Sequence, residues 1–354
     1  MLPSEALAAE AALHYVSDAE TPGYTRRRQG KGFVFVDPKG RPVRDAATRA
    51  RLAALVIPPA WTDVWIAPSP RAHLQATGVD ARGRKQYIYH QDWVSARDRS
   101  KFDRMIAFGR ALPTIRRRVA RDLNSPPLSR ARVLAVVVDL LDQTLIRVGS
   151  ESYARENGTY GLTTLRDRHA RADADGLVLE FRGKNGTPHR VKVGDRRLAR
   201  IVRECQELPG QQLFQYLDDA GARHDVTSAD VNAYLHEIAG GDFTAKDFRT
   251  WRATVHAACT LCAVGCSATP TAAKRTVNAA VKEVAAALRN TAAVCRKSYI
   301  HPAVIDAYLG GELTFDVPAV RRPRARYGLG ADERAVLAWL RKGGRTRKAT
   351  LKSS

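Results

Sequence analysis

The pattern of hydrophobic residues changes near residue 91, and this change divides the chain into two parts of different structure. Before it, short segments alternate between apolar and polar residues and end at turn-forming residues, which is typical of β-strands. After it, apolar residues recur every three to four positions over long segments, which is typical of amphipathic helices. The sequence therefore predicts an α+β protein, with a small and mostly antiparallel β domain over residues 1–90 and a mostly α domain over 91–310.

Each part has expected elements that can be located by residue number. In the first part, GFVFV, the turn DPKG and RPV predict a hairpin over 32–43, preceded by a short amphipathic helix at the start of the chain. A helix over 45–55 and strands over 62–67, 71–77 and 85–90 are expected to follow.

The second part is predicted to be helical with one interruption. Helices are expected over 91–112, 114–123 and 129–147, and again from Asp195 to about Leu309. Between them, residues 168–193 alternate and carry the turns ADADG and GKNGT, which predicts a small three-stranded sheet inserted in the helical domain.

The charge of the chain indicates a polyanionic partner. The chain has 58 Lys and Arg against 36 Asp and Glu, a net charge of +22. So many positive side chains repel one another unless a polyanion binds to the surface, and nucleic acid is the leading partner. We find no apolar run of membrane-spanning length and no signal peptide, so the expected location is cytoplasmic. Residues 311–354 form a basic tail, in which the blocks RRPRAR and RKGGRTRK flank one short apolar helix expected at 331–340. The charged blocks are either a solvated tail or an extra phosphate-binding arm.

Five cysteines, an odd number, argue against a disulfide framework and for a reducing compartment. Cys259, Cys262 and Cys266 share one face of a predicted helix, so small buried side chains explain them better than a metal site. Asp173 and Asp175 are explained by their turn. Since nucleotide-binding and zinc-binding motifs are also missing from the sequence, we expect neither a metal nor a small-molecule cofactor.

Without such a group, side chains alone must neutralise the charge that builds on a phosphodiester under attack, and arginine is suited to this. Arg147 is expected to end a long apolar helix just before Gly149, although basic residues favour helix C-termini for other reasons. Thr244 and Asp247 form a capping box, so Lys246 and Arg249 are expected three residues apart at the start of one helix, where an exposed basic turn is the alternative. Lys184 is expected at the tip of the GKNG turn, where an ordinary solvated lysine is the alternative.

Several segments, in this order along the chain, resemble the poxvirus-like, bacterial branch of the type IB DNA topoisomerases. The resemblance covers roughly residues 15 to 309 and leaves the tail outside. It is carried by the following segments: ATGVDARGRKQYIYH, LIRVGSESYARENGTYGLTTLRDRH, FRGKNG, KDFRTWRATV and AAVCRKSYIHP.

The resemblance implies a mechanism and a role for each matched position. Tyr299 is implied as the nucleophile that forms a 3'-phosphotyrosyl link during relaxation of supercoiled DNA, without ATP or metal. The implied catalytic helpers are the phosphate-binding Arg147 and Arg249, the general acid Lys184, the assisting Lys246, and Asn290. The implied DNA-contacting residues are Gln86, Tyr87, Tyr89 and Tyr153. A monomer acting on double-stranded DNA at the nucleoid is expected, with a catalytic domain similar to that of tyrosine recombinases.

Two positions depart from the family pattern. The family usually has His nine residues before the nucleophile, where this chain has Asn290, whose amide can donate a hydrogen bond but cannot titrate. Many viral members carry Asp after the hairpin lysine, where this chain has Asn185. On one unbroken helix, Asn290 and Tyr299 would lie about 180° apart and about 13.5 Å along the axis. We therefore predict a helix break at 289–291.

Two other classes of protein fit part of this pattern. A tyrosine recombinase shares the Arg, Lys, Arg and Tyr set but usually has His three residues before the second arginine, where this chain has Lys246. A non-catalytic DNA-binding protein would fit the charge equally well.

Overall fold

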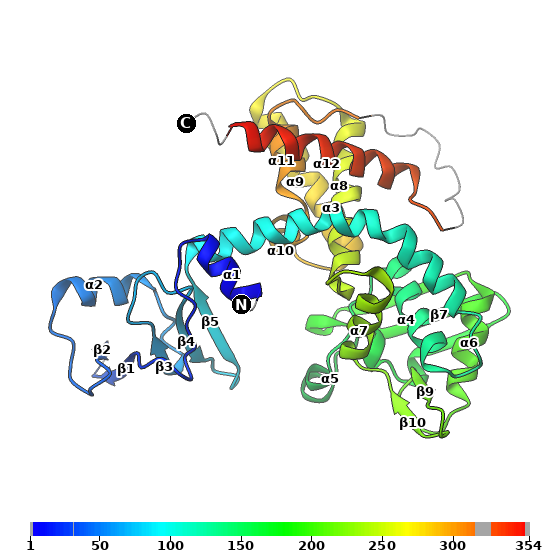
Figure 1. Cartoon of the computed structure of the whole chain (residues 1–354), viewed down its shortest axis with the longest axis horizontal. Helices are drawn as coiled ribbons and strands as arrows, with labels where there is room; N and C mark the ends of the chain where they lie inside the picture. Colours follow the sequence, from blue (N-terminus) through cyan, green and yellow to red (C-terminus); the bar gives the residue numbers. More distant parts are fainter. Residues whose placement is uncertain (1–2, 31, 316–326, 351–354) are drawn as a thin grey trace. The chain divides into compact units, whose positions relative to one another are not determined.

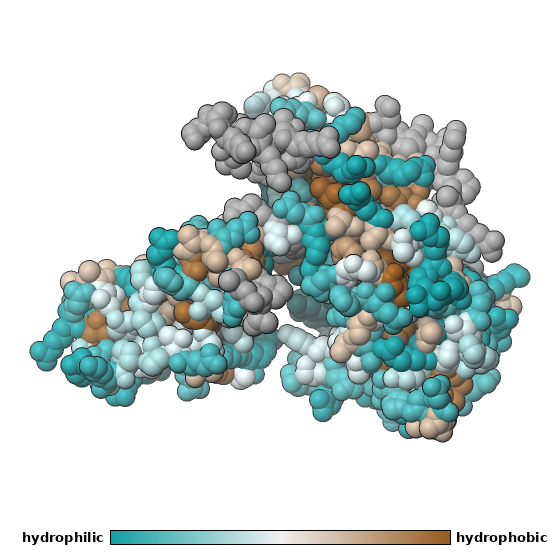
Figure 2. All heavy atoms as spheres, in the orientation of Figure 1, coloured by the Kyte–Doolittle hydropathy of each residue, from teal (hydrophilic) through white to brown (hydrophobic). Residues whose placement is uncertain are grey.

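The computed structural model describes residues 3–30, 32–315 and 327–350, and it divides into two compact units, Met1–Asp103 and Arg104–Ser354 (Figure 1). The division falls inside one long helix, α3 (Gln91–Asp122). Hydrophilic residues cover most of the visible face of both units (Figure 2). In the described part of the chain, no helix has the length and apolar character needed to cross a membrane. The basic block RRPRAR, at 321–326, lies outside the described residues.

The first unit is built on a five-stranded sheet in the order β2-β1-β3-β4-β5, with every neighbouring pair antiparallel. Its elements are α1 (Pro3–Glu10), β1 (Tyr24–Gln29), β2 (Gly32–Val36), α2 (Ala46–Ala54), β3 (Thr62–Ile66), β4 (Leu74–Val79) and β5 (Lys85–Tyr89). One core cluster joins Leu52 of α2 to Val64, Ile66 and Ala76 of the sheet. The prediction of a small, mostly antiparallel β region at the N-terminus is confirmed.

Strand β1 was not predicted, because its sequence YTRRRQ is polar on both faces. It pairs along the whole length of β2, whereas the predicted partner segment RPV meets β2 only through one bridge, Val36 to Pro42. Arg26 explains how a polar strand is held in the sheet. Its guanidinium donates to the carbonyl oxygens of Ile57, Pro58 and Trp61 and stacks 4.1 Å from the centre of the Phe33 ring.

The second unit is mostly helical, as predicted, with two small sheets. Its helices, besides part of α3, are α4 (Arg130–Thr144), α5 (Glu151–Asn157), α6 (Arg196–Gln206), α7 (Ser228–Ala239), α8 (Ala245–Val264), α9 (Pro270–Leu288), α10 (Ala292–Ser298), α11 (Pro302–Leu309) and α12 (Ala331–Thr350). The predicted three-stranded sheet is present as β6 (Ala170–Asp173), β7 (Gly176–Arg182) and β8 (Pro188–Val193). A second sheet, β9 (Gln215–Leu217) with β10 (Arg223–Asp225), was not predicted, because three-residue strands are too short to show a period.

Helix α3 continues through Pro113, although two helices separated at this proline were predicted. Proline removes one backbone hydrogen bond, which ordinarily ends or bends a helix. Here the residues on both sides of it, Phe108, Leu112, Ile115 and Val119, are buried on one apolar face. Burial of that face offsets the missing bond, so the helix runs on to Asp122.

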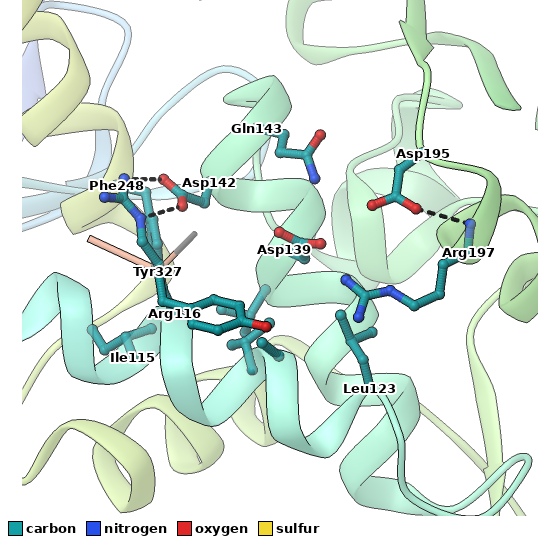
Figure 3. Close-up of a pocket in the computed structure, with 13 residues that line it drawn as sticks. Ile115, Arg116, Leu123, Asp139, Asp142, Gln143, Asp195, Arg197, Phe248 and Tyr327 are labelled. Atoms are coloured by element: carbon teal, nitrogen blue, oxygen red, sulfur yellow. Dashed lines mark hydrogen bonds and ion pairs between the residues drawn. The ribbon is translucent and has the colours of Figure 1, made fainter. Parts of the chain in front are cut away.

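Helix α12 is packed into the second unit through a buried ion network. Arg116 of α3 donates to both oxygens of Asp142 on α4 and to both oxygens of Glu333 on α12, at 2.8 to 3.1 Å (Figure 3 shows the Arg116–Asp142 pair). Glu333 is 2% exposed and also accepts from Trp251 Nε1 on α8, at 3.1 Å. The short apolar helix expected at 331–340 is therefore present as part of α12, and Glu333 anchors it to α3 and α8.

Replacing Arg116 by Met should lower the free energy of unfolding by about 3–5 kcal/mol, because two buried carboxylates would lose their counter-ion. Urea denaturation measures this. Arg117→Met is the matched control, since Arg117 is exposed and should tolerate the same change. Equal stabilities for the two variants would contradict the role given to the network.

Candidate active site

A cavity of about 280 Å³ in the second unit gathers most of the residues singled out in the sequence. Its lining contains six of them: Arg147, Tyr153, Lys184, Lys246, Arg249 and Tyr299. These residues are spread over more than 150 positions of the chain. They lie on helices or at helix ends, at a hairpin tip and in the loop after α4. Four cationic side chains and two tyrosines thus face a single hollow that could hold a phosphodiester.

Arg147 lies in a loop, three residues past the end of α4, and does not end the helix as predicted. The helix stops because Leu145 takes the left-handed conformation, with φ 59°, and because the Thr144 hydroxyl turns back to the Leu140 carbonyl. The loop is held by Gly161. A Cβ there would lie 2.6 Å from the Arg147 carbonyl oxygen, so only glycine allows the two chains to come so close. The Arg147 side chain is half-buried on the cavity wall.

Lys184 lies at the tip of the β7–β8 hairpin, as predicted. The turn is closed by hydrogen bonds from the Gly183 N–H to the Thr187 carbonyl and from the Gly186 N–H to the Gly183 carbonyl, at 2.8 and 3.0 Å. Asn185 takes a left-handed conformation, φ 62°, which asparagine tolerates better than most residues. The lysine side chain is exposed and lines the cavity.

Lys246 and Arg249 lie on the first turns of α8, and the predicted capping box is confirmed. The Asp247 carboxylate accepts hydrogen bonds from the Thr244 N–H and hydroxyl, at 2.8 and 2.9 Å. Arg104 fixes Asp247 further through an ion pair of 3.2 Å. The positive end of the α8 dipole and two cations therefore converge on the cavity, which is an arrangement suited to an anion.

Arg249 is the most constrained of the cationic residues. It is 3% exposed and donates to two backbone carbonyls, that of Leu145 just after α4 and that of Leu288 at the end of α9. Burial lowers the pKa of its guanidinium, and repulsion from the positive charge of Arg147 on the same cavity wall lowers it further. A bound phosphate would relieve this repulsion.

Tyr299 ends α10 and lies against Arg249. The guanidinium carbon is 5.3 Å from the centre of the tyrosine ring. The backbone around it is fixed, because its N–H donates to the Cys295 carbonyl at 3.0 Å and its carbonyl accepts from the Thr254 hydroxyl at 3.2 Å. The ring is 9% exposed and forms part of the cavity wall.

Comparison with known proteins identifies the family of this chain. Residues 86–310 match the family described as eukaryotic DNA topoisomerase I, catalytic core, and residues 32–80 match the bacterial DNA topoisomerase IB N-terminal domain. A DNA topoisomerase 1B of Acanthamoeba polyphaga mimivirus is 32% identical over 238 residues, which are 66% of this chain and 71% of the viral protein. The chain belongs to the type IB DNA topoisomerases.

Two further relatives match shorter parts of this topoisomerase. The DNA topoisomerase 1B of Vaccinia virus, strain Copenhagen, is 28% identical over 116 residues, which cover 33% of this chain and 37% of the viral protein. The DNA topoisomerase 1 of Mycosarcoma maydis is 26% identical over 197 residues, which cover 49% of this chain and 19% of the fungal protein. The resemblance inferred from the sequence motifs is confirmed.

Asn290 is the one proposed catalytic residue that does not line the cavity of the topoisomerase. The predicted helix break is confirmed: α9 ends at Leu288, Arg289 is left-handed with φ 48°, and α10 begins after Thr291. Asn290 lies between the helices and is half-buried, and its side-chain oxygen accepts from the Thr291 N–H at 3.1 Å. Its amide N–H₂ group is left to act as a donor.

The remaining proposed DNA-contacting residues lie on β5 and α5. Gln86 is held by a hydrogen bond of 2.9 Å from its amide to Asp80. Tyr87 and Tyr89 stack with ring centres 6.0 Å apart, and Tyr87 is exposed. Tyr153 is also exposed, on α5.

The three clustered cysteines do not share one helix face, contrary to the prediction, because α8 ends at Val264 and Gly265 turns the chain before Cys266. Cys262 donates to the Phe315 carbonyl. Among the described residues, no group of His, Cys, Asp and Glu is arranged to hold a metal ion.

Sequence reasoning missed three hydroxyl-bearing residues that line the cavity, Ser150, Thr159 and Tyr160. They lie within a segment already recognised as family-like, but nothing in the sequence distinguishes them from their neighbours. Their side-chain hydroxyls add polar groups to a wall otherwise dominated by cations.

Proposed function

We propose that this topoisomerase relaxes supercoiled DNA by cutting and rejoining one strand through a covalent 3'-phosphotyrosyl link at Tyr299. The observation that carries the proposal is the gathering of Arg147, Lys184, Lys246, Arg249 and Tyr299 around one cavity. Such a set supplies a nucleophile, charge neutralisation and a proton donor without help from any other group.

In the proposed reaction, the Tyr299 hydroxyl gives its proton to a solvent water molecule, its oxygen forms a bond to phosphorus, and the bond from phosphorus to the 5'-oxygen breaks. Arg147 and Arg249 bind the non-bridging oxygens, whose negative charge grows in the transition state. Lys184, assisted by Lys246, gives a proton to the departing 5'-oxygen, because an alkoxide is too basic to leave readily. Asn290 is proposed to donate to a phosphate oxygen through its amide.

One phosphodiester is exchanged for another, so the link to Tyr299 preserves the bond energy that religation requires. The reverse steps reseal the strand after the duplex has rotated to release its torsion. We therefore propose that neither ATP nor a metal ion is needed.

We propose that different parts of the chain have different roles. Residues 1–90 bind DNA, with Gln86, Tyr87 and Tyr89 as contacts, and residues 91–310 cut it, with Tyr153 as a further contact. Residues 311–354 contribute the basic C-terminal region. The working form is proposed to be a monomer acting on double-stranded DNA at the nucleoid, and the catalytic domain is proposed to share its fold with tyrosine recombinases.

A plasmid relaxation assay tests this function and separates it from that of a recombinase. The proposal expects a supercoiled plasmid of arbitrary sequence to be converted to relaxed topoisomers, with no exchange between DNA molecules. Lys246 in place of the recombinase His favours relaxation. Strand exchange at a specific sequence would support the recombinase instead.

DNA affinity should depend steeply on salt, because most contacts are expected to be with phosphates. The logarithm of the binding constant should fall with the logarithm of salt concentration, with a slope of about −0.9 per phosphate neutralised. Lys246→Gln should make this slope less negative by about 1, since it removes one phosphate contact. Fluorescence anisotropy with a labelled duplex measures both, and a flat response would contradict the predicted binding mode.

A further inference from the structure

His189, on β8, is a buried polar residue with no assigned role. Its imidazole is 7% exposed and stacks on Phe181 of β7, with ring centres 4.6 Å apart. Within the described part of the protein, neither ring nitrogen has a hydrogen-bond partner. A buried polar atom without a partner costs stability, so a phenyl ring would fill this space more favourably. The fold alone does not account for a histidine here.

The imidazole lies directly beneath the turn that carries Lys184. Phe181 and His189 are cross-strand partners, and Gly183 directly follows β7, two residues after Phe181. A Cβ placed on Gly183 would lie 2.5 Å from His189 Nε2, so the ring occupies the space that any other side chain would take. The unpaired nitrogen is therefore next to the residue that precedes Lys184.

The surroundings keep this imidazole uncharged. Burial, together with the positive charges of Arg289, Arg147 and Arg249, lowers the pKa of His189 to about 4. An uncharged imidazole has one nitrogen that can accept a hydrogen bond, whereas a protonated ring has none. Near neutral pH, His189 thus offers an acceptor in a region otherwise occupied by cations.

Arg289 connects this hairpin to the segment that leads to Tyr299. Its guanidinium donates to the carbonyl of Arg190, the residue after His189, at 3.2 Å. Arg289 also ends α9 in a left-handed conformation, immediately before Asn290 and α10. The lysine hairpin and the tyrosine helix are therefore tied together beside His189.

We propose that His189 is a positioning residue for Lys184, whose ammonium group donates a hydrogen bond to the free imidazole nitrogen and is thereby aimed at the departing 5'-oxygen. The inference rests on the proposed role of Lys184 as general acid. Three observations support it: the ring nitrogen beside Gly183 has no partner, Lys184 is exposed at the adjacent position, and Lys184 lines the cavity.

Single-turnover cleavage of two matched DNA substrates tests the proposal. One has the natural 5'-bridging oxygen, and the other has sulfur at that atom, which leaves as a weakly basic thiolate and needs no proton. His189→Phe should slow cleavage of the oxygen substrate by about 10- to 100-fold, the value of a hydrogen bond to a charged group. With the sulfur substrate, the cleavage rate of His189→Phe should return to that of the unchanged protein. His189→Gln keeps a hydrogen-bond acceptor, so it should cleave the oxygen substrate at nearly the rate of the unchanged protein.

Controls separate the failure of this inference from failure of the proposed function. Lys184→Ala should show the same rescue by sulfur, and if it does not, Lys184 is not the general acid. Suppose instead that Lys184→Ala is rescued by sulfur but His189→Phe is not. If His189→Phe then slows cleavage of the oxygen and sulfur substrates by the same factor, the positioning role is wrong. In the Lys184→Ala background, His189→Phe should slow cleavage no further, and an additional loss there would also overturn the proposal. Arg190→Ala is a matched control that keeps the backbone carbonyl and should cleave normally.

Discussion

Tyr299→Phe is expected to abolish plasmid relaxation and to remove every trace of covalent protein–DNA adduct. The substitution deletes one oxygen and leaves the ring in place against Arg249, at 5.3 Å from its guanidinium carbon. Without that oxygen no bond to phosphorus can form, and no neighbouring hydroxyl replaces a nucleophile fixed at the end of α10. Relaxation of supercoiled plasmid and gel detection of the adduct under denaturing conditions measure the loss.

The affinity of Tyr299→Phe for duplex DNA should be nearly unchanged, because most of the binding energy is expected from phosphate contacts elsewhere. Tyr160→Phe is the matched control, since Tyr160 lines the same cavity and should remain active. This pair of variants also separates an enzyme from a non-catalytic DNA-binding protein. Full relaxation by Tyr299→Phe would eliminate the proposed nucleophile.

Arg249→Ala is expected to reduce the cleavage rate by about 10³- to 10⁵-fold, the range found when an arginine that stabilises a phosphoryl transition state is removed. It should also lower stability, because the carbonyls of Leu145 and Leu288 would lose their buried donor. Rapid-quench cleavage and thermal unfolding measure the two effects independently.

Arg147→Ala provides the comparison that separates these effects. Arg147 is half-buried in a loop, and within the described residues its guanidinium makes no hydrogen bond to a side chain or carbonyl that would be lost. Its removal should slow cleavage strongly while the melting temperature stays close to that of the unchanged protein. Loss of stability without loss of rate in Arg249→Ala would indicate that this arginine only holds α4 and α9 together.

The sequence was informative wherever a local signal determines structure. The change in period near residue 91, the GKNG turn and the Thr244–Asp247 capping box each depend on neighbouring residues, and the structure confirms the elements that they predict. The break at Arg289 followed from a requirement of geometry, that Asn290 and Tyr299 not share one helix, and it is also present.

What the sequence did not reveal depends on partners distant along the chain. Strand β1 is held by contacts from Arg26 to residues more than thirty positions away, and α3 passes Pro113 because its apolar face is buried. The sequence marks the region around Glu333 only as a short helix between basic blocks, yet Glu333 pairs with Arg116, which lies 217 positions earlier in the chain. The environment of His189 likewise becomes visible only when the hairpin places its ring against Gly183.

The covalent intermediate provides the most direct test of the account. Supercoiled plasmid should be relaxed in EDTA without ATP, and rapid denaturation should then trap the protein on a nicked strand, with a peptide containing Tyr299 attached to the 3'-phosphate and a free 5'-hydroxyl. Attachment to a 5' end, attachment through another residue, or a requirement for a divalent cation would contradict it.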